Sequence, residues 1–253
     1  MPISADELID QTYASGRVTG RSGRVHELHS AIDREKGEFL RSIVANHPQI
    51  VRTLEVGCAY GLSSLFICSE LAKRVGASHT IIDPFQNTDW DGVGTLNLDN
   101  AGIEFYRFIE DLSEFALPDL LRETEGSFDL IFVDGFHTFD QSLLDCYYAT
   151  RLLRIGGVLV LDDVALLPVG RAALYFQSYP CYETLAAVTE TRRKPAKAVV
   201  SKVLKTVFSR DRWSKVMAAS LARKLLDYPR TEMIALRKIA DDTREWNWYT
   251  DNF

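Results

Sequence analysis

Residues 53–64 read TLEVGCAYGLSS. An apolar β-like run ends in Glu55 and Val56, and two glycines, Gly57 and Gly61, then lead into a second apolar run of helical character. Glycine lets a ligand approach the backbone without meeting a Cβ, and the N-terminus of a helix attracts a carboxylate. The turn lacks the G-x-G-x-x-G pattern that dinucleotide-binding folds use for pyrophosphate. We therefore expect a ligand without a pyrophosphate at this turn.

The composition is that of an ordinary globular chain. Its 253 residues, 46% of them hydrophobic and 25% charged, fit one large α/β domain, or one domain with an appendage. No window approaches the roughly 20 apolar residues of a membrane span, and the polar, acidic residues 1–7 do not resemble a signal peptide. The four cysteines show no C-x-x-C spacing, which favours reduced thiols. We expect a cytoplasmic protein.

Apolar strands alternate with amphipathic helices along most of the chain. This alternation predicts a mostly parallel sheet with helices on both faces. The predicted strands are 51–56, 79–83, 103–108, 128–134, 158–163, 182–188 and 233–238. The predicted helices are 27–46, 63–74, 112–123, 140–153 and 169–178.

Four of the predicted strands end in acidic residues. These are Glu55, Asp83, Asp134 and the pair Asp162-Asp163. Ligands of open parallel sheets bind beyond the carboxyl ends of the strands. Like charges gathered in one crevice need a cation or a polyhydroxyl ligand nearby, so the pattern predicts a binding site at this edge of the sheet.

Two of these strand regions resemble a known family. Residues 128–137 read FDLIFVDGFH and residues 154–163 read RIGGVLVLDD. Together with 53–64 and 79–86, they resemble the class I S-adenosylmethionine-dependent methyltransferases, in the small-molecule O-methyltransferase-like branch of the methyltransferase-24 group. The resemblance covers residues 27–165 and 233–253.

That resemblance implies a Rossmann-like sheet of seven strands, with the last strand antiparallel between the fifth and the sixth. Residues 1–50 would form an N-terminal helical segment on the acceptor side. Residues 51–253 would form the methyltransferase domain, with a basic helical insertion at about 192–230.

The same resemblance implies S-adenosylmethionine as the cofactor, a ligand without phosphate. The glycine turn would hold its amino-acid tail, Asp83 would accept both ribose hydroxyls, and the turn at 110–113 would contact the adenine. The implied cofactor contacts are Glu55, Gly57, Gly61, Ser63, Ser64, Asp83, Asp111, Ser113 and Asp134. For Asp111, an N-cap at the start of a helix is the competing interpretation.

Methyl transfer to a hydroxyl also requires the acceptor to lose a proton. A metal ion can lower the acceptor's pKa, or a base can take the proton. Asp134, Asp162 and Asp163 offer the oxygen ligands that Mg²⁺ or another divalent cation prefers, although they could instead cap helices in a metal-free site. His137, three residues after Asp134, is the alternative base, although it could instead cap the following helix or lie near the adenine.

The predicted insertion is strongly basic. Residues 191–230 contain twelve Lys or Arg against two Asp, whereas the rest of the chain is acidic. We expect two amphipathic helices here, for which three uses stay open: a cap packed on the sheet domain, a subunit interface of a homo-oligomer or a substrate lid, and binding to an anionic membrane surface. The acidic body and the absence of a recognition motif argue against nucleic acid.

The function we predict is methyl transfer to a small-molecule acceptor, at a hydroxyl oxygen. Two alternatives remain at this stage. One is an NAD-dependent oxidoreductase of Rossmann type, which the missing glycine pattern disfavours. The other is a non-catalytic, cofactor-binding subunit of a larger assembly.

Overall fold

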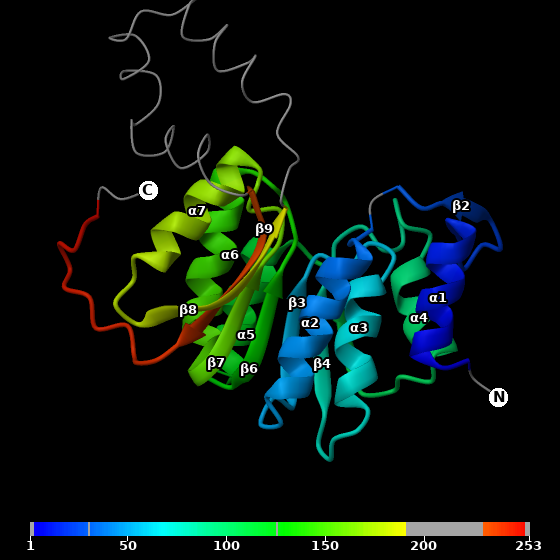
Figure 1. The fold of residues 1–253 in the computed structure, drawn as a ribbon, viewed down its shortest axis with the longest axis horizontal. Helices are drawn as coiled ribbons and strands as arrows, with labels where there is room; N and C mark the ends of the chain where they lie inside the picture. The colour runs from blue at the N-terminus through cyan, green and yellow to red at the C-terminus, as the bar shows by residue number, and fades with distance from the viewer. Residues whose placement is uncertain (1–2, 30, 125, 191–229, 251–253) are drawn as a thin grey trace, which may run out of the picture.

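The structure is a computed structural model that describes residues 3–29, 31–124, 126–190 and 230–250. Its main sheet has seven strands, namely β3 (Arg52–Val56), β4 (Ser78–Ile82), β5 (Tyr106–Ile109), β6 (Phe128–Val133), β7 (Leu153–Leu161), β8 (Tyr182–Glu190) and β9 (Arg230–Lys238). Their order in space is β5-β4-β3-β6-β7-β9-β8 (Figure 1). The five strands β5, β4, β3, β6 and β7 run parallel to one another, whereas β9 runs antiparallel to its neighbours β7 and β8. The predicted sheet, including its antiparallel last strand, is confirmed.

Helices cover both faces of this sheet. They are α1 (Ala5–Ser15), α2 (Arg34–Asn46), α3 (Leu62–Leu71), α4 (Val93–Asn100), α5 (Ser113–Thr124), α6 (Phe139–Leu152) and α7 (Leu167–Gln177). One core joins α1, α2 and α3 to strand residues such as Leu130 and Phe132. The other joins α5, α6 and α7 to residues such as Ile131 and Val133. Alternate residues of β6 thus point to opposite cores, as a strand buried on both sides requires.

The chain order reverses between β3 and β6. β4 and β5 extend the sheet on one side of β3, whereas β6 and β7 extend it on the other. The carboxyl ends of these strands lie level, because the amide of Asp134 donates to the carbonyl of Val56 at 2.8 Å and the amide of Gly57 donates to that of Ile82 at 2.9 Å. Such a switch point is where ligands bind in sheets of this kind.

The N-terminal segment differs from the prediction in one respect. A helix was expected over 27–46, but α2 begins only at Arg34. A two-stranded hairpin, β1 (Arg17–Thr19) and β2 (Val25–Glu27), precedes it. Asp91 holds the hairpin in place: its carboxylate accepts hydrogen bonds from Ser22 and lies 3.1 Å from Nε2 of His26. This contact spans 65 residues or more, so local periodicity gave no sign of it.

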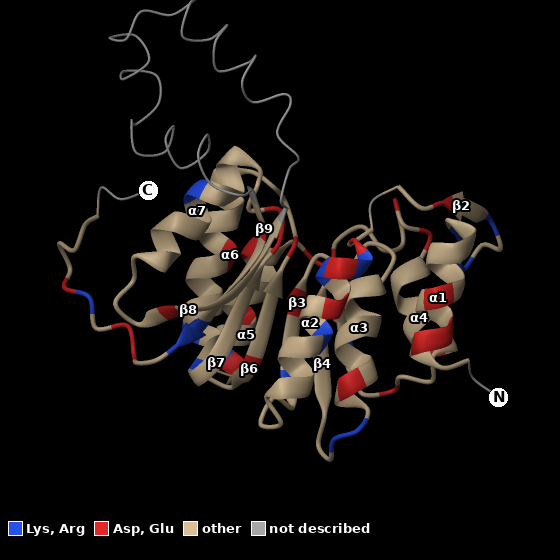
Figure 2. Ribbon diagram, in the orientation of Figure 1, with Lys and Arg blue, Asp and Glu red and all other residues tan. Residues whose placement is uncertain are grey.

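The predicted basic insertion at 192–230 falls almost wholly outside the described residues. Within the part of the chain that is described, basic and acidic residues are interspersed over the helices and strands (Figure 2). No helix in that part is long and apolar enough to cross a membrane. The four cysteines are free and buried.

Candidate functional site

The glycine turn between β3 and α3 has the backbone geometry that only glycine adopts easily. Gly57 has a φ of +87° and Gly61 one of +74°. A Cβ at Gly57 would overlap the carbonyl oxygen of Asp134, at the end of the neighbouring strand β6. No side chain caps α3, which starts right after Gly61, so its first N–H groups remain available to a ligand.

Asp83 lies at this turn and fixes its shape. Its Oδ2 accepts the amide hydrogens of Cys58 and Ala59, each at 2.9 Å, and also contacts the side-chain nitrogen of Gln86 at 3.2 Å. Its Oδ1 accepts the amide of Phe85 at 2.8 Å. A carboxylate offers about four acceptor positions, so Oδ2 is fully used whereas Oδ1 retains one for a ligand. The structure thus brings Asp83 to the glycine turn, as predicted from the sequence.

Glu55 and Ser64 lie behind the turn and not on the cleft. The carboxylate of Glu55 is completely buried and accepts the hydroxyls of Ser63 and Ser64. Nε2 of His79 lies 3.0 Å from the same carboxylate. Ser63 lines the cleft, but Glu55 and Ser64 do not. In the structure these two residues hold the start of α3, and their contact with a cofactor stays a prediction.

Asp111 also lies off the cleft, but it is exposed. Its carboxylate accepts the amide of Leu112 at 2.8 Å. Leu112 and Ser113 themselves line the cleft. Of the four residues 110–113, which were predicted to contact the adenine, the structure thus places Leu112 and Ser113 on the cleft.

The cleft has a volume of about 460 Å³ and opens over the carboxyl ends of the strands. Aromatic side chains line two of its walls. Phe85 and Phe136 pack edge to face with ring centres 5.8 Å apart, and Tyr60 and Trp90 do so at 5.1 Å. Sequence reasoning missed these walls, because isolated aromatic residues in loops resemble those of any core.

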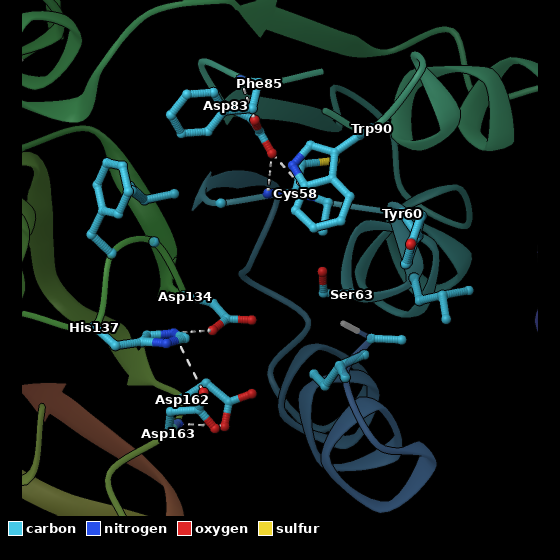
Figure 3. Close-up of a pocket in the computed structure, with 18 of the residues that line it drawn as sticks. Cys58, Tyr60, Ser63, Asp83, Phe85, Trp90, Asp134, His137, Asp162 and Asp163 are labelled. Atoms are coloured by element: carbon cyan, nitrogen blue, oxygen red, sulfur yellow. Dashed lines mark hydrogen bonds and ion pairs between the residues drawn. The ribbon is translucent and has the colours of Figure 1, made fainter. Parts of the chain in front are cut away.

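An acidic cluster lies at one side of the cleft. Figure 3 shows Asp134, His137, Asp162 and Asp163 gathered there, across the cleft from Asp83 and Trp90. Nε2 of His137 lies 3.3 Å from Asp134 and 3.4 Å from Asp163. The predicted catalytic and metal-binding residues are therefore brought together by the loops after β6 and β7.

Lys36 of α2 joins this cluster and was not predicted. Its ammonium nitrogen lies 2.6 Å from Asp162 and 3.1 Å from Asp163. Its side chain is buried, as is that of Asp162. Nothing in the sequence distinguished this lysine from a solvated one, because the contact joins residues more than 120 positions apart.

The pKa values of the cluster reflect its crowding. Burial, helped by the charge of Asp134, raises the pKa of Asp162 to about 7. Burial by itself would lower the pKa of Lys36, but the charges of Asp162 and Asp163 raise it. The hydrogen bond to Asp134 raises the pKa of His137, so this imidazole binds a proton more readily than a free histidine.

Among the described residues, one group of three side chains could hold a metal ion, and it overlaps with the predicted set only in part. Ligand atoms of Asp134, His137 and Asp163 lie within 4.8 Å of one another. Asp162, which was also predicted as a ligand, pairs with Lys36 instead. Two carboxylates and an imidazole fit a divalent cation, and the imidazole favours a transition metal over Mg²⁺.

Comparisons with known proteins agree with this architecture. Residues 54–164 match the sequence family described as "Methyltransferase domain", which confirms the resemblance over that region. A catechol O-methyltransferase of Niastella koreensis is 29% identical over 137 residues. That match covers 53% of this chain and 58% of the relative, so it spans less than two thirds of the relative's length.

Solved structures share the fold over a longer stretch. An O-methyltransferase from Bacillus cereus, in complex with SAH, superposes with a TM-score of 0.62 at 14% identity, covering 92% of this chain and 90% of that one. The O-methyltransferase TomG from Streptomyces achromogenes, in complex with SAM, gives a TM-score of 0.61 at 16% identity, covering 92% and 89%. At such identities the likeness shows a common fold.

Proposed function

We propose that this chain, whose residues 54–164 match the methyltransferase-domain family, is an S-adenosylmethionine-dependent methyltransferase acting on a hydroxyl group of a small molecule. One arrangement supports this most directly. The turn with a positive φ at Gly57, the carboxylate of Asp83 and the imidazole of His137 all line a single cleft. The NAD-dependent alternative is not favoured, since the turn offers no glycine pattern for a pyrophosphate.

The cofactor would lie across the carboxyl ends of β3, β4 and β6. Its amino-acid tail would face Gly57, Ser63 and the uncapped start of α3. A ribose hydroxyl would donate to the free position on Oδ1 of Asp83. The adenine would lie near Phe85 and Phe136, whose rings form one wall of the cleft. The sulfonium would then face the acidic cluster.

The reaction would be an in-line displacement at the methyl carbon. The acceptor oxygen forms a bond to that carbon, the bond from carbon to sulfur breaks, and S-adenosylhomocysteine leaves with the electron pair. His137 takes the acceptor's proton, and its contacts with Asp134 and Asp163 stabilise the imidazolium that results. Alignment of the two reactants supplies much of the rate, on the order of 7–11 kcal/mol.

A divalent cation at the acidic cluster is a more specific proposal, separate from the role of His137 as a base. Asp134 and Asp163 would hold it, with the imidazole of His137 as the third ligand; in that arrangement the cation, and not His137, would promote loss of the acceptor's proton. Such a cation supplies Lewis-acid polarisation of the acceptor hydroxyl. Titration of the purified chain with Mn²⁺, followed by electron paramagnetic resonance, tests this arrangement: one bound ion is expected, with affinity lost in Asp163→Asn. An equal affinity in the two proteins would contradict it.

Two observations suggest the class of acceptor: the aromatic side chains that line the cleft, and the similarity to a catechol O-methyltransferase. Aromatic rings of Tyr60 and Trp90 line the cleft, and stacking on aromatic walls suits a planar ring. The similar protein from Niastella koreensis is a catechol O-methyltransferase. Small aromatic diols are therefore the first acceptors to assay.

Calorimetric titration tests the cofactor assignment. S-adenosylhomocysteine should bind and NAD should not. Asp83→Ala should abolish that binding, with a folded far-ultraviolet spectrum as the control for the turn that Asp83 supports. Binding of NAD, or unchanged affinity of Asp83→Ala for S-adenosylhomocysteine, would contradict the assignment.

His137→Ala tests the catalytic role. Loss of a general base should lower kcat at least 100-fold, while affinity for S-adenosylhomocysteine changes little. His47→Ala, at the C-terminal end of α2, is the matched control and should keep full activity. Normal cofactor affinity without turnover on any acceptor in wild type would instead support the non-catalytic subunit.

A further inference from the structure

The hairpin of β1 and β2 is weakly anchored by apolar contacts. Among the residues of its two short strands, only Val18 is buried. Val18 belongs to a small core cluster with Tyr60 and Val93. A two-stranded hairpin is marginally stable by itself in water. The position of this hairpin therefore depends on its polar contacts as well.

Asp91, in the loop between β4 and α4, supplies those contacts. Its Oδ1 accepts the amide of Ser22 at 3.1 Å, and its Oδ2 accepts the hydroxyl of the same residue and lies 3.1 Å from Nε2 of His26. Its backbone carbonyl accepts the amide of Arg21 at 2.8 Å. The hydrogen bond from Ser22, together with that of His26, lowers the pKa of Asp91. One loop residue thus binds the hairpin through both its side chain and its backbone.

The same two segments meet in one wall of the cleft. The hairpin leads to His29, and the loop places Trp90 directly before Asp91; both side chains line the cleft, as does Tyr60. The ring centre of His29 lies 5.9 Å from that of Trp90 and 5.6 Å from that of Tyr60. A movement of the hairpin away from the loop would therefore separate His29 from Trp90 and widen the cleft.

The opposite wall is held more firmly. Figure 3 shows the acidic cluster across the cleft from Trp90, and in that cluster Lys36 pairs with the buried Asp162 at 2.6 Å. The contacts of Asp91 with Ser22 are exposed, so each contributes less than a buried pair. A segment with few buried contacts opens at a lower free energy than the whole fold unfolds.

We infer that the hairpin is a gate of the cleft, and that Asp91 is the positioning residue that holds this gate closed. Ligands enter and leave when the hairpin opens transiently. Asp91, Ser22 and His26 do not line the cleft, so their mutual contacts are the same in the free and the ligated protein. Those contacts consequently cancel from the equilibrium affinity and affect only the rates. The inference rests on the proposed function, because its test uses S-adenosylhomocysteine as the ligand.

Asp91→Gly tests the gate. Glycine removes the carboxylate but adopts the φ of +50° found at this position without strain. Stopped-flow fluorescence measures association and dissociation of S-adenosylhomocysteine. Both rate constants should rise about 10-fold, the factor expected for loss of a hydrogen bond to a charged group. Because the two increases offset each other, Kd should change less than about threefold.

Hydrogen exchange of the unliganded protein gives a second readout. The amide of Arg21 donates to the backbone carbonyl of residue 91, which glycine retains. Its exchange should be about 10-fold faster in Asp91→Gly. The amide of Leu65 in α3, which donates to Gly61 at 2.9 Å, should exchange at the wild-type rate.

Three further variants separate the gate from effects of charge. Asp91→Asn removes the charge but keeps an oxygen acceptor and a residue type that tolerates a positive φ, so its rates should stay within about threefold of wild type. Ser22→Ala should raise both rates, but much less in the Asp91→Gly background, where its partner is already absent. Asp89→Asn changes an exposed acid of the same loop and should match wild type.

Unchanged rates in both Asp91→Gly and Ser22→Ala would overturn the inference. A higher Kd with unchanged association in Asp91→Gly would show a role in affinity instead, and equal acceleration in Asp91→Asn and Asp91→Gly would show an effect of charge; each contradicts the gate. If S-adenosylhomocysteine does not bind wild type, the proposed function fails. Exchange of the Arg21 amide still tests the closing role of Asp91, and an unchanged rate in Asp91→Gly would overturn that role independently.

Discussion

Lys36 shows how one side chain balances an acidic cluster. Three carboxylates, those of Asp134, Asp162 and Asp163, meet at the ends of β6 and β7. The ammonium of Lys36 contacts two of them, and His137 contacts the third together with Asp163. Without these partners, like charges at this spacing would repel strongly in a half-buried site.

Lys36→Met should therefore destabilise the fold. Removing one partner of a buried ion pair leaves the other charge uncompensated, which costs about 3 kcal/mol. Urea unfolding measures the change. Lys73→Met is the matched control: the Lys73 side chain is 66% exposed in its pair with Glu70, and this pair should contribute less than about 1 kcal/mol. Losses of equal size in the two variants would contradict a structural role for the buried pair.

Asp145 should give the stability of the protein a measurable pH dependence. Burial raises the pKa of this carboxyl to about 6, from an ordinary value of 3.8. A carboxyl whose pKa rises on folding favours the folded state while it is protonated, and this contribution is lost as the pH rises from about 4 through 6. Asp145→Asn stays neutral throughout.

Relative to wild type, Asp145→Asn should thus gain stability between pH 4 and pH 7.5. The expected gain is on the order of 2–3 kcal/mol, because a pKa that differs by one between the folded and unfolded states corresponds to about 1.4 kcal/mol. Urea unfolding of both proteins at the two pH values measures it. A difference between them that does not change with pH would show that Asp145 titrates normally.

The turn between β3 and α3 combines two requirements in one element. It must adopt positive φ angles at Gly57 and Gly61, and it must pass close to the backbone of the neighbouring strand. Asp83 from the end of β4 then binds the turn's amide groups. The turn is thus held between Asp83, at the end of β4, and the backbone of Asp134, at the end of β6. We expect these contacts to keep the turn rigid before a ligand binds.

Gly57→Ala should abolish binding of S-adenosylhomocysteine. An alanine at this φ is strained, and its Cβ would overlap the carbonyl oxygen of Asp134. Gly76→Ala provides the control, because Gly76 has a similar φ of +76° but nothing within 4 Å of the added atom. The control should lose about 1–2 kcal/mol of stability and retain full affinity. Retained affinity in Gly57→Ala would show that the turn can move aside.

At the scale of the whole molecule, the N-terminal segment belongs to the main core. Ile9 of α1 is completely buried in the same cluster as Phe66 of α3. Tyr13 packs against Phe66 with ring centres 6.4 Å apart, and Arg41 of α2 pairs with Asp6. The resemblance implied an N-terminal helical segment over 1–50, and these contacts tie the first helix of that segment to the sheet domain.

Ile9→Ala should accordingly lower the stability of the whole protein. Loss of a buried isoleucine costs about 3 kcal/mol, and unfolding should remain a single transition for every probe. Val75→Ala, a fully exposed position, should change stability by less than about 0.5 kcal/mol. Two separate transitions in Ile9→Ala would indicate that α1 folds independently of the sheet.

Several features of the protein were already determined by its sequence. Runs such as 130–133 are apolar throughout because a strand covered on both faces has no solvent side, so the sheet and most of its helices were predictable. Gly57, Asp83, Asp134 and His137, which line the cleft, were picked out as candidates for a similar reason. Ligand chemistry at strand ends requires particular residue types immediately after an apolar run.

Other features were decided only by the tertiary structure. Lys36 meets Asp162 and Asp91 holds the hairpin of β1 and β2, both across long separations in sequence. The same holds for Glu55, which the sequence placed on the cofactor and the fold turned inward to Ser63 and Ser64. Local patterns record which face of an element is buried, whereas the partner of a polar side chain depends on how distant elements pack.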